Sequence, residues 1–473
     1  MSKTLKQNAL SIVDAVVLAV AGTAPSYTLN ATTATLVAAV GLASPGALLY
    51  GAIPMFGITF AFMHLNRWRA DAGAGYAWVG RSLNPTLGFF CAWTFLTLST
   101  VFMVTAALPI GVTTLDVIAP QYKENVAITT LVASLWLIAV STLTILGVSL
   151  AACFQRIMTS IEVVSLLALS IGAWVKFSAN PVQAFSWSWF SPTAFDGFSS
   201  FVAGMTIAAF YYFGWDVSAN VAEETQNANA TPGKSGILGM IGIFVLFLMM
   251  QVAAQMGVSP EEMQKNSASL LPALGNAIFP RPWGSIAILA VLVSTVGTME
   301  TQLTQCTRML FSMGRDRVMS RRFEDIHPRF QTPWLSGLVV TLLALLLLVL
   351  SSSSESIGSL MQSLISAIGV MVSFYYGMTG IACAWYYRKT LRQNLQTFLV
   401  QGVRSVGSAL ILFGIALVQL TQLGWEVAGL TIAAIASGII PMVYYRLKYN
   451  SSFYSESPEQ HGLPKEQDLI KVI

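Results

Sequence analysis

The stretch SIVDAVVLAVAGTAPSYTLNATTATLVAAVG, residues 11–41, is apolar and long enough to cross a bilayer, but helix-breaking residues interrupt its middle. A membrane-spanning helix needs about 20 apolar residues, and this one is broken between Gly22 and Pro25. Backbone groups freed by such a break are tolerated in a bilayer only where protein or a water-filled cavity satisfies them. The N–H groups of residues 23–27 would begin a second half-helix and favour an anion such as a carboxylate. The carbonyl groups before Gly22 would favour an ammonium group or another cation.

A second stretch, FVAGMTIAAFYYFGWDVSANVAEET at residues 201–225, has the same character. Gly214 lies between aromatic residues and is followed closely by Asp216, so the carbonyl groups just before the glycine are freed for a cation. Ordinary membrane helices also contain Pro and Gly, and a simple kink is the alternative explanation for each site. Two breaks in corresponding positions of two halves instead indicate the binding site of an inverted-repeat transporter, which is the interpretation we favour.

The composition is that of a membrane protein. Of 473 residues, 55% are hydrophobic and only 10% are charged, against about 25% charged in soluble domains. The excess apolar surface must therefore face lipid, and the hydrophobic runs yield twelve candidate spans. They are residues 11–40, 45–66, 85–112, 127–149, 155–176, 198–225, 234–257, 284–312, 334–350, 357–387, 404–422 and 426–446, with bounds good to about three residues. The gaps at 177–197, 258–283 and 313–333 are expected to be loops.

The basic residues predict how the chain is oriented. With the N-terminus in the cytosol, 21 of the 25 Lys and Arg residues fall on the cytosolic side, as the positive-inside rule requires. The other four are Lys123, Lys176, Lys265 and Arg281. The net charge of +4 therefore reflects topology, and no nucleic-acid partner is expected. We expect a multi-pass protein of the inner (plasma) membrane with both termini cytosolic.

Several classes of chemistry find no support in the sequence. The cysteines are Cys91, Cys153, Cys306 and Cys383, and their spacing suggests neither a disulfide framework nor a metal site. The histidines, His64, His327 and His461, fall in polar segments that we expect to be loops, which would exclude a histidine relay within the membrane. A membrane-embedded enzyme would need such groups at depth, and a channel would not need two opposed helix breaks. No cofactor and no metal are expected.

Few carboxylates can lie deep in the membrane. They are Glu162 in the fifth span, Asp216 at the break of the sixth, and Glu300 in the eighth, where Ser294 lies nearly two turns earlier. A charge at the bilayer centre costs roughly 2.5–3.5 kcal/mol on insertion scales, so such residues usually face the bundle interior. We predict that Glu162, Glu300 and Ser294 take part in coupling, with a protonated structural acid as the alternative. Asp216 could instead cap the second half of its helix. Glu223 and Glu224 are expected to be solvated or paired within a loop.

The stretch GWDVSANVAEETQNANATPG, residues 214–233, resembles the amino acid–polyamine–organocation (APC) transporter superfamily, which has the LeuT-type fold. DAGAGYAWVGRSLNPTLGFFCAW at 71–93 and SMGRDRVMSRRFEDIHPRFQTPW at 312–334 are similar to its loops after helices 2 and 8. The resemblance covers about residues 8–445. It implies an all-α integral membrane protein with a 5+5 inverted repeat, broken helices 1 and 6, and two C-terminal helices.

The implied units are two inverted repeats at residues 1–197 and 198–400, helices 11–12 at 401–446, and a flexible cytosolic tail at 447–473. The resemblance also implies a substrate held between the two breaks. The residues carried over are Ala21, Gly22, Thr23, Ala24 and Ser26 in helix 1 and Phe210, Phe213, Gly214 and Trp215 in helix 6, with Asp216 beside them.

This chain departs from the family pattern in two places. Many members have Gly-Ser-Gly or a variant in the first break, whereas here Pro25 removes one N–H donor. Where Glu162 falls, proton-coupled members often carry a lysine, so the sign of the charge is reversed. The resemblance thus implies a permease that moves an amino acid or related amine by alternating access, proton-coupled or by exchange. A polyamine or organic amine importer of the same fold is the alternative.

Overall fold

A computed structural model describes residues 4–266, 270–280, 282–353 and 357–455. Within these ranges the chain is helical and forms no strand, apart from an isolated bridge between Leu10 and Thr225. Ten helical stretches are long and apolar enough to cross a membrane. The predicted all-α membrane class is confirmed.

The helices follow the predicted order. The first half contains α1 (Ile12–Gly22), α2 (Pro25–Val40), α3 (Ser44–Trp68), α4 (Gly75–Ser82), α5 (Pro85–Ile118), α6 (Val126–Leu146) and α7 (Val148–Phe177). The second contains α8 (Gly197–Tyr211), α9 (Val217–Asn220), α10 (Thr231–Gly257), α11 (Pro260–Lys265), α12 (Leu270–Ile278), α13 (Ile286–Arg315), α14 (Trp334–Ser351) and α15 (Ile357–Tyr386). The chain then forms α16 (Leu395–Thr397), α17 (Arg404–Gln422), α18 (Trp425–Ala436) and α19 (Ile439–Tyr449).

The ten long stretches cover eleven of the twelve predicted spans. Residues Ile12–Trp68 form one apolar stretch of 57 residues, more than twice what one crossing needs, and the 3₁₀ turn at Gly41–Ala43 separates the first two spans within it. The sixth predicted span is the α8–α9 pair, of which α8 alone is a shorter apolar helix. The symmetry between the two halves stays a prediction.

Both predicted breaks are present. Helix α1 ends at Gly22 and α2 begins at Pro25, with Ala24 between them in the left-handed region at φ 47°. Helix α8 ends at Tyr211 and α9 begins at Val217, with Gly214 at φ 104°. A proline and a glycine with positive φ are features that end one helix and start another in a new direction.

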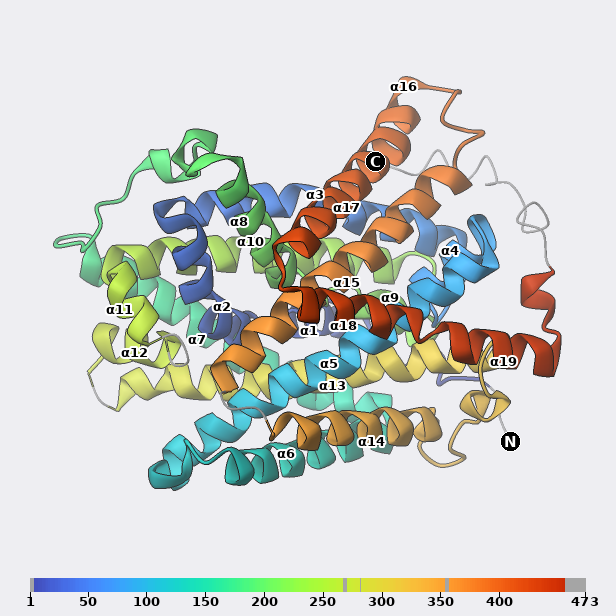
Figure 1. Cartoon of the computed structure of the whole chain (residues 1–473), viewed down its shortest axis with the longest axis horizontal. Coiled ribbons are helices and arrows are strands. Elements are labelled where there is room, and N and C mark those ends of the chain that lie inside the picture. Colours follow the sequence, from blue (N-terminus) through green and yellow to red (C-terminus); the bar gives the residue numbers. More distant parts are fainter. Residues whose placement is uncertain (1–3, 267–269, 281, 354–356, 456–473) are drawn as a thin grey trace.

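The long helices run side by side, and the molecule has two distinct ends (Figure 1). One end carries α4, α19 and the N-terminal residues, and we call it the α4 end. The other carries α11 and α12, and we call it the α11 end. Because α11 and α12 lie within residues 258–283, the expectation of a loop there is wrong: the segment folds into two short helices, of which α11 begins with Ser259 and Pro260 at cap positions.

Two further expectations fail at the α4 end. The polar segment that contains His64 is not a loop: it forms the last part of α3, where His64 and Asn66 are buried. Asn66 donates to the Ala228 carbonyl, and the His64 ring packs edge-on against Tyr387. Nor is the start of the predicted flexible tail free: Phe453 is buried against the ring of Tyr76. Residues 456–473, with His461, lie outside the described part of the chain, as do Arg281 and Ser354.

Candidate functional site

The backbone groups at the α1–α2 break are largely hydrogen-bonded within the protein. The N–H of Thr23 donates to the Val20 carbonyl at 3.2 Å and that of Ala24 to the Ala21 carbonyl at 3.0 Å. The carbonyl of Gly22 accepts from the hydroxyl of Thr298 on α13 at 3.1 Å. The expectation of free N–H donors at residues 23 and 24 is therefore wrong, because the chain turns tightly enough for these amides to reach carbonyls three residues back.

Two predicted coupling residues meet at the start of α2. Ser26 donates its backbone N–H to Glu162 Oε1 of α7 at 2.8 Å, and Tyr27 donates its backbone N–H to the hydroxyl of Ser294 on α13 at 3.1 Å. All four residues are buried. Residues far apart in the sequence thus converge on one helix terminus, where the partial positive charge of the backbone dipoles stabilises a carboxylate.

The second break is held by an aromatic residue that the sequence did not single out. The hydroxyl of Tyr376 on α15 donates to Asp216 Oδ1 at 2.8 Å and accepts the N–H of Gly214 at 3.2 Å. Asp216 stands at the N-cap position of α9, as the capping alternative requires, but its side chain makes no capping hydrogen bond to that helix. A pair of tyrosines followed by glycine at 375–377, like the one near Gly214, is the only signal that could have pointed to Tyr376.

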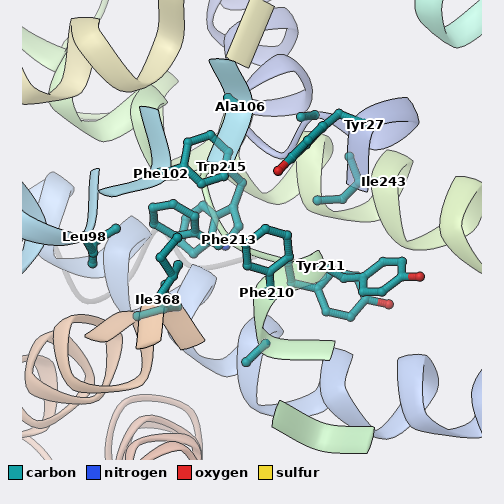
Figure 2. Close-up of a cluster of buried hydrophobic side chains, with 14 of the residues drawn as sticks. Tyr27, Leu98, Phe102, Ala106, Phe210, Tyr211, Phe213, Trp215, Ile243 and Ile368 are labelled. Carbon is teal, nitrogen blue, oxygen red and sulfur yellow. The ribbon is translucent and has the colours of Figure 1, made fainter. Parts of the chain in front are cut away.

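Aromatic side chains cluster beside the second break. Figure 2 shows the rings of Phe102, Phe210, Phe213 and Trp215 grouped together. Phe102 of α5 lies 6.2 Å from Phe210 and 5.9 Å from Phe213 between ring centroids, and Trp215 stacks on Tyr376 at 5.6 Å. Phe210, Phe213 and Trp215 were predicted site residues, whereas Phe102 was not, because an apolar residue inside an apolar span carries no sequence signal.

Glu300 lies further along α13, six residues and nearly two turns past Ser294. It is buried, and its Oε1 accepts from Thr304 of the same helix at 2.8 Å, whereas its Oε2 has no hydrogen-bond partner within the described ranges. Glu162 is bound at the start of α2 instead. That Glu162 and Glu300 share one cavity stays a prediction.

A cluster of ion pairs, which we call the ionic cluster, lies at the α4 end. Asp71 in the loop after α3 is 3.1 Å from Arg315 at the end of α13, and Arg81 of α4 is 2.8 Å from Asp316. Burial alone would raise the pKa of Asp71, but the guanidinium groups of Arg315, Arg81 and Arg69 hold this pKa well below its ordinary value.

Glu223 and Glu224, which follow α9, also form ion pairs in this cluster. Arg315 donates to Glu223 at 3.0 Å, while Arg308 and Glu224 form an ion pair at 2.8 Å in which both side chains are almost fully buried. The expectation of a solvated or loop-paired Glu224 is wrong, because its partner projects from α13 into the bundle. The backbone N–H of Leu10 also donates to the Glu224 carbonyl at 3.0 Å.

Known proteins resemble this chain along most of its length. The sequence model of the amino acid permease family matches residues 10–445, nearly the whole chain and both breaks. The chain belongs to the amino acid permease family. As a member of that family it is a membrane permease, which agrees with its fold.

The relatives of this permease are distant. It is 21% identical over 386 residues to the low-affinity putrescine importer PlaP of Escherichia coli strain K12, covering 77% of this chain and 79% of that protein. It is 20% identical over 347 residues to the b(0,+)-type amino acid transporter 1 of Mus musculus, covering 71% and 67% respectively. A match to the vacuolar cationic amino acid transporter 4 of Arabidopsis thaliana is 24% identical over 296 residues and covers 59% of this chain and 48% of that protein.

Proposed function

We propose that this permease is a secondary active transporter that moves an amino acid or related amine across the plasma membrane by alternating access. The observation that carries the proposal is the meeting of two broken helices in the interior, each break beside a buried carboxylate. Discontinuous helices in corresponding positions mark the substrate site of inverted-repeat transporters. The substrate class is supported by relatives whose names describe amino acid transporters and a putrescine importer.

The substrate site is proposed to lie where α1–α2 and α8–α9 change direction. The backbone of the site is proposed to come from the predicted substrate-contacting residues between Ala21 and Ser26 and from Gly214. Phe210, Phe213 and Trp215 supply aromatic surface, which suits the alkyl chain or the ammonium group of the substrate. Asp216, held by Tyr376, supplies negative charge.

The α4 end is proposed to face the cytosol, as the distribution of basic residues indicates. The Asp71–Arg315 and Arg308–Glu224 ion pairs join the loop after α3, the end of α9 and the end of α13. These segments must separate before a substrate can leave toward that side. The ionic cluster is therefore the proposed cytosolic gate, closed in this conformation.

Coupling to protons is proposed to use Glu162. This buried carboxylate bonds to Ser26, which belongs to the broken helix that contacts the substrate. If a proton on Glu162 changes how α2 is held, substrate binding and proton binding affect each other by the same factor, which is the requirement for coupling.

Counterflow in proteoliposomes tests the proposed function. A carrier exchanges labelled for unlabelled solute, whereas a channel only dissipates the gradient and an enzyme consumes the solute. Labelled amino acids and amines would first be chosen by thermal shift, because a ligand stabilises by RT ln(1 + [L]/Kd). Counterflow with a compound of either class supports the proposal, and dissipation or consumption without exchange overturns it.

A further inference from the structure

The start of α2 leaves no backbone donor for a substrate. Pro25 has no N–H, the N–H of Ser26 is bonded to Glu162, and that of Tyr27 is bonded to Ser294. The next N–H, that of Thr28, donates to the Ala24 carbonyl at 2.8 Å. The first turn of a helix normally offers such groups to an anion. In this chain every one of them is absent or used by the protein itself.

The group bonded to Ser26 is a carboxylate, the same chemical group that an α-amino acid would present. Glu162 is 1% exposed and projects from α7, a helix of 30 residues that also packs against α1 and α13. Its place is therefore set by a long, packed helix and not by a mobile loop.

We propose that Glu162 is a built-in substitute for a substrate carboxylate, and that this permease selects cationic amines that lack an α-carboxylate. The inference rests on the proposed function, since it concerns the substrate of that same site. A substrate carboxylate would have to displace Glu162 from the start of α2 or lie next to it. Lying next to it places two like charges together in a poorly solvated interior, where repulsion is stronger than in water.

The amine end has a matching position at the other break. Asp216 uses Oδ1 to accept from Tyr376, while its Oδ2 is buried and accepts no hydrogen bond of ordinary geometry within the described ranges, although the side chains of Tyr375 and Gln305 lie near the carboxylate. The rings of Trp215 and Tyr376 stack beside it, and ring faces attract ammonium groups. An ammonium group would satisfy the remaining oxygen. Both breaks thus present negative charge, which favours an amine over a zwitterion.

The test compares pairs of solutes that differ only in a carboxylate: putrescine with ornithine, and cadaverine with lysine. Each compound competes for counterflow of a labelled amine in proteoliposomes of the full-length protein. We expect each diamine to inhibit at a concentration at least about tenfold lower than its amino acid partner, a ratio that corresponds to ~1.4 kcal/mol. Equal inhibition within either pair would overturn the inference and leave the proposed function intact. Counterflow with neither class would overturn both.

A variant isolates the role of Glu162. Glu162→Ala removes the internal carboxylate and frees the Ser26 N–H, so we expect the preference for the diamine to fall at least about tenfold. Ser165→Ala is the matched control, because Ser165 lies one turn along the same face of α7, is buried, and donates its hydroxyl to the Ile161 carbonyl of its own helix. Its preference should match that of the wild type. An unchanged preference in a folded Glu162→Ala protein would contradict the inference, and if that variant does not fold, the wild-type comparison still decides it.

Discussion

Gly22 and Gly214, the two glycines at the helix breaks, pack backbone against backbone. A Cβ atom on either residue would overlap the carbonyl group of the other, and Gly214 also has φ of 104°. The two broken helices are thereby in direct contact at their least regular points. Any movement of α1 relative to α8 must therefore change the contact between Gly22 and Gly214, and with it the arrangement of the proposed substrate site.

Gly214→Ala should reduce uptake at least about tenfold, because the added methyl group must displace the Gly22 carbonyl and an L-residue is strained at this φ. Initial rates of uptake in proteoliposomes, at matched amounts of protein, measure the effect. Gly242→Ala is the control: this glycine of α10 has open space around a would-be Cβ, and alanine is the better helix former. Equal rates for the two variants would show that the contact is dispensable.

Phe210→Ala and Trp215→Ala should damage uptake far more than they damage expression. Both side chains are buried in the aromatic group beside the second break, and removing either opens the wall of the proposed site. Phe198→Ala provides the comparison, since Phe198 lies on the same helix as Phe210 but is 76% exposed. Uptake and membrane abundance are measured in parallel. Normal transport by both site variants would place the substrate elsewhere.

Glu162→Gln keeps the shape of the side chain and removes its titration. We expect this variant to lose the pH dependence of uptake, or proton-driven accumulation, while still permitting exchange. Glu300→Gln should show a similar but weaker effect if the two acids share a cavity. Uptake is recorded against external pH in proteoliposomes, with and without an imposed pH gradient. A Glu162→Gln profile that superposes on the wild type, with undiminished accumulation, would assign Glu162 a structural role only.

Asp71→Asn should destabilise the closed α4 end by roughly 3 kcal/mol, the lower part of the range for breaking a buried ion pair, because Arg69 and Arg315 keep some contact with solvent. Asp116→Asn breaks the exposed pair with Lys123 and should cost less than about 1 kcal/mol. Thermal unfolding in detergent compares the two variants. A loss for Asp71→Asn no larger than that of the control would remove Asp71 from the gate.

Asp71 also makes the stability of the folded protein depend on pH. Because the folded-state pKa of Asp71 is depressed, its contribution is present at every pH above the unfolded value of about 3.9 and is lost as the pH falls below it. The difference between wild type and Asp71→Asn should therefore be constant from about pH 8 to 5 and shrink below about pH 4. A stability difference that vanished near neutral pH would contradict the depressed folded-state pKa of Asp71.

The orientation can be tested by cysteine labelling in a background without the four native cysteines. Lys265→Cys on α11 should react with an impermeant reagent added outside the cell, and Arg321→Cys at the α4 end should react only when the reagent reaches the cytosol. The reverse pattern would invert the topology and place the ionic cluster on the outer side.

The predictable part of this protein is local along the chain. The break at Gly22–Pro25 followed from residues adjacent in sequence, because proline and glycine act on the backbone where they stand. The spans followed from the length of apolar runs, and the second break from Gly214 among aromatic residues. The sequence also indicated that Glu162 and Glu300 face the bundle interior, since a charge exposed to lipid is costly, and both side chains are buried.

Only the tertiary structure decided what these residues touch. Nothing in the sequence links Ser26 to Glu162, 136 positions away, or Asp216 to Tyr376, 160 positions away. The expectation that Glu224 is solvated or paired within a loop failed for the same reason, since a charged residue near a helix end is buried or exposed according to the element that covers it, here α13. A helix period tells which residues share a face, but the packing of helices distant in sequence determines which faces meet.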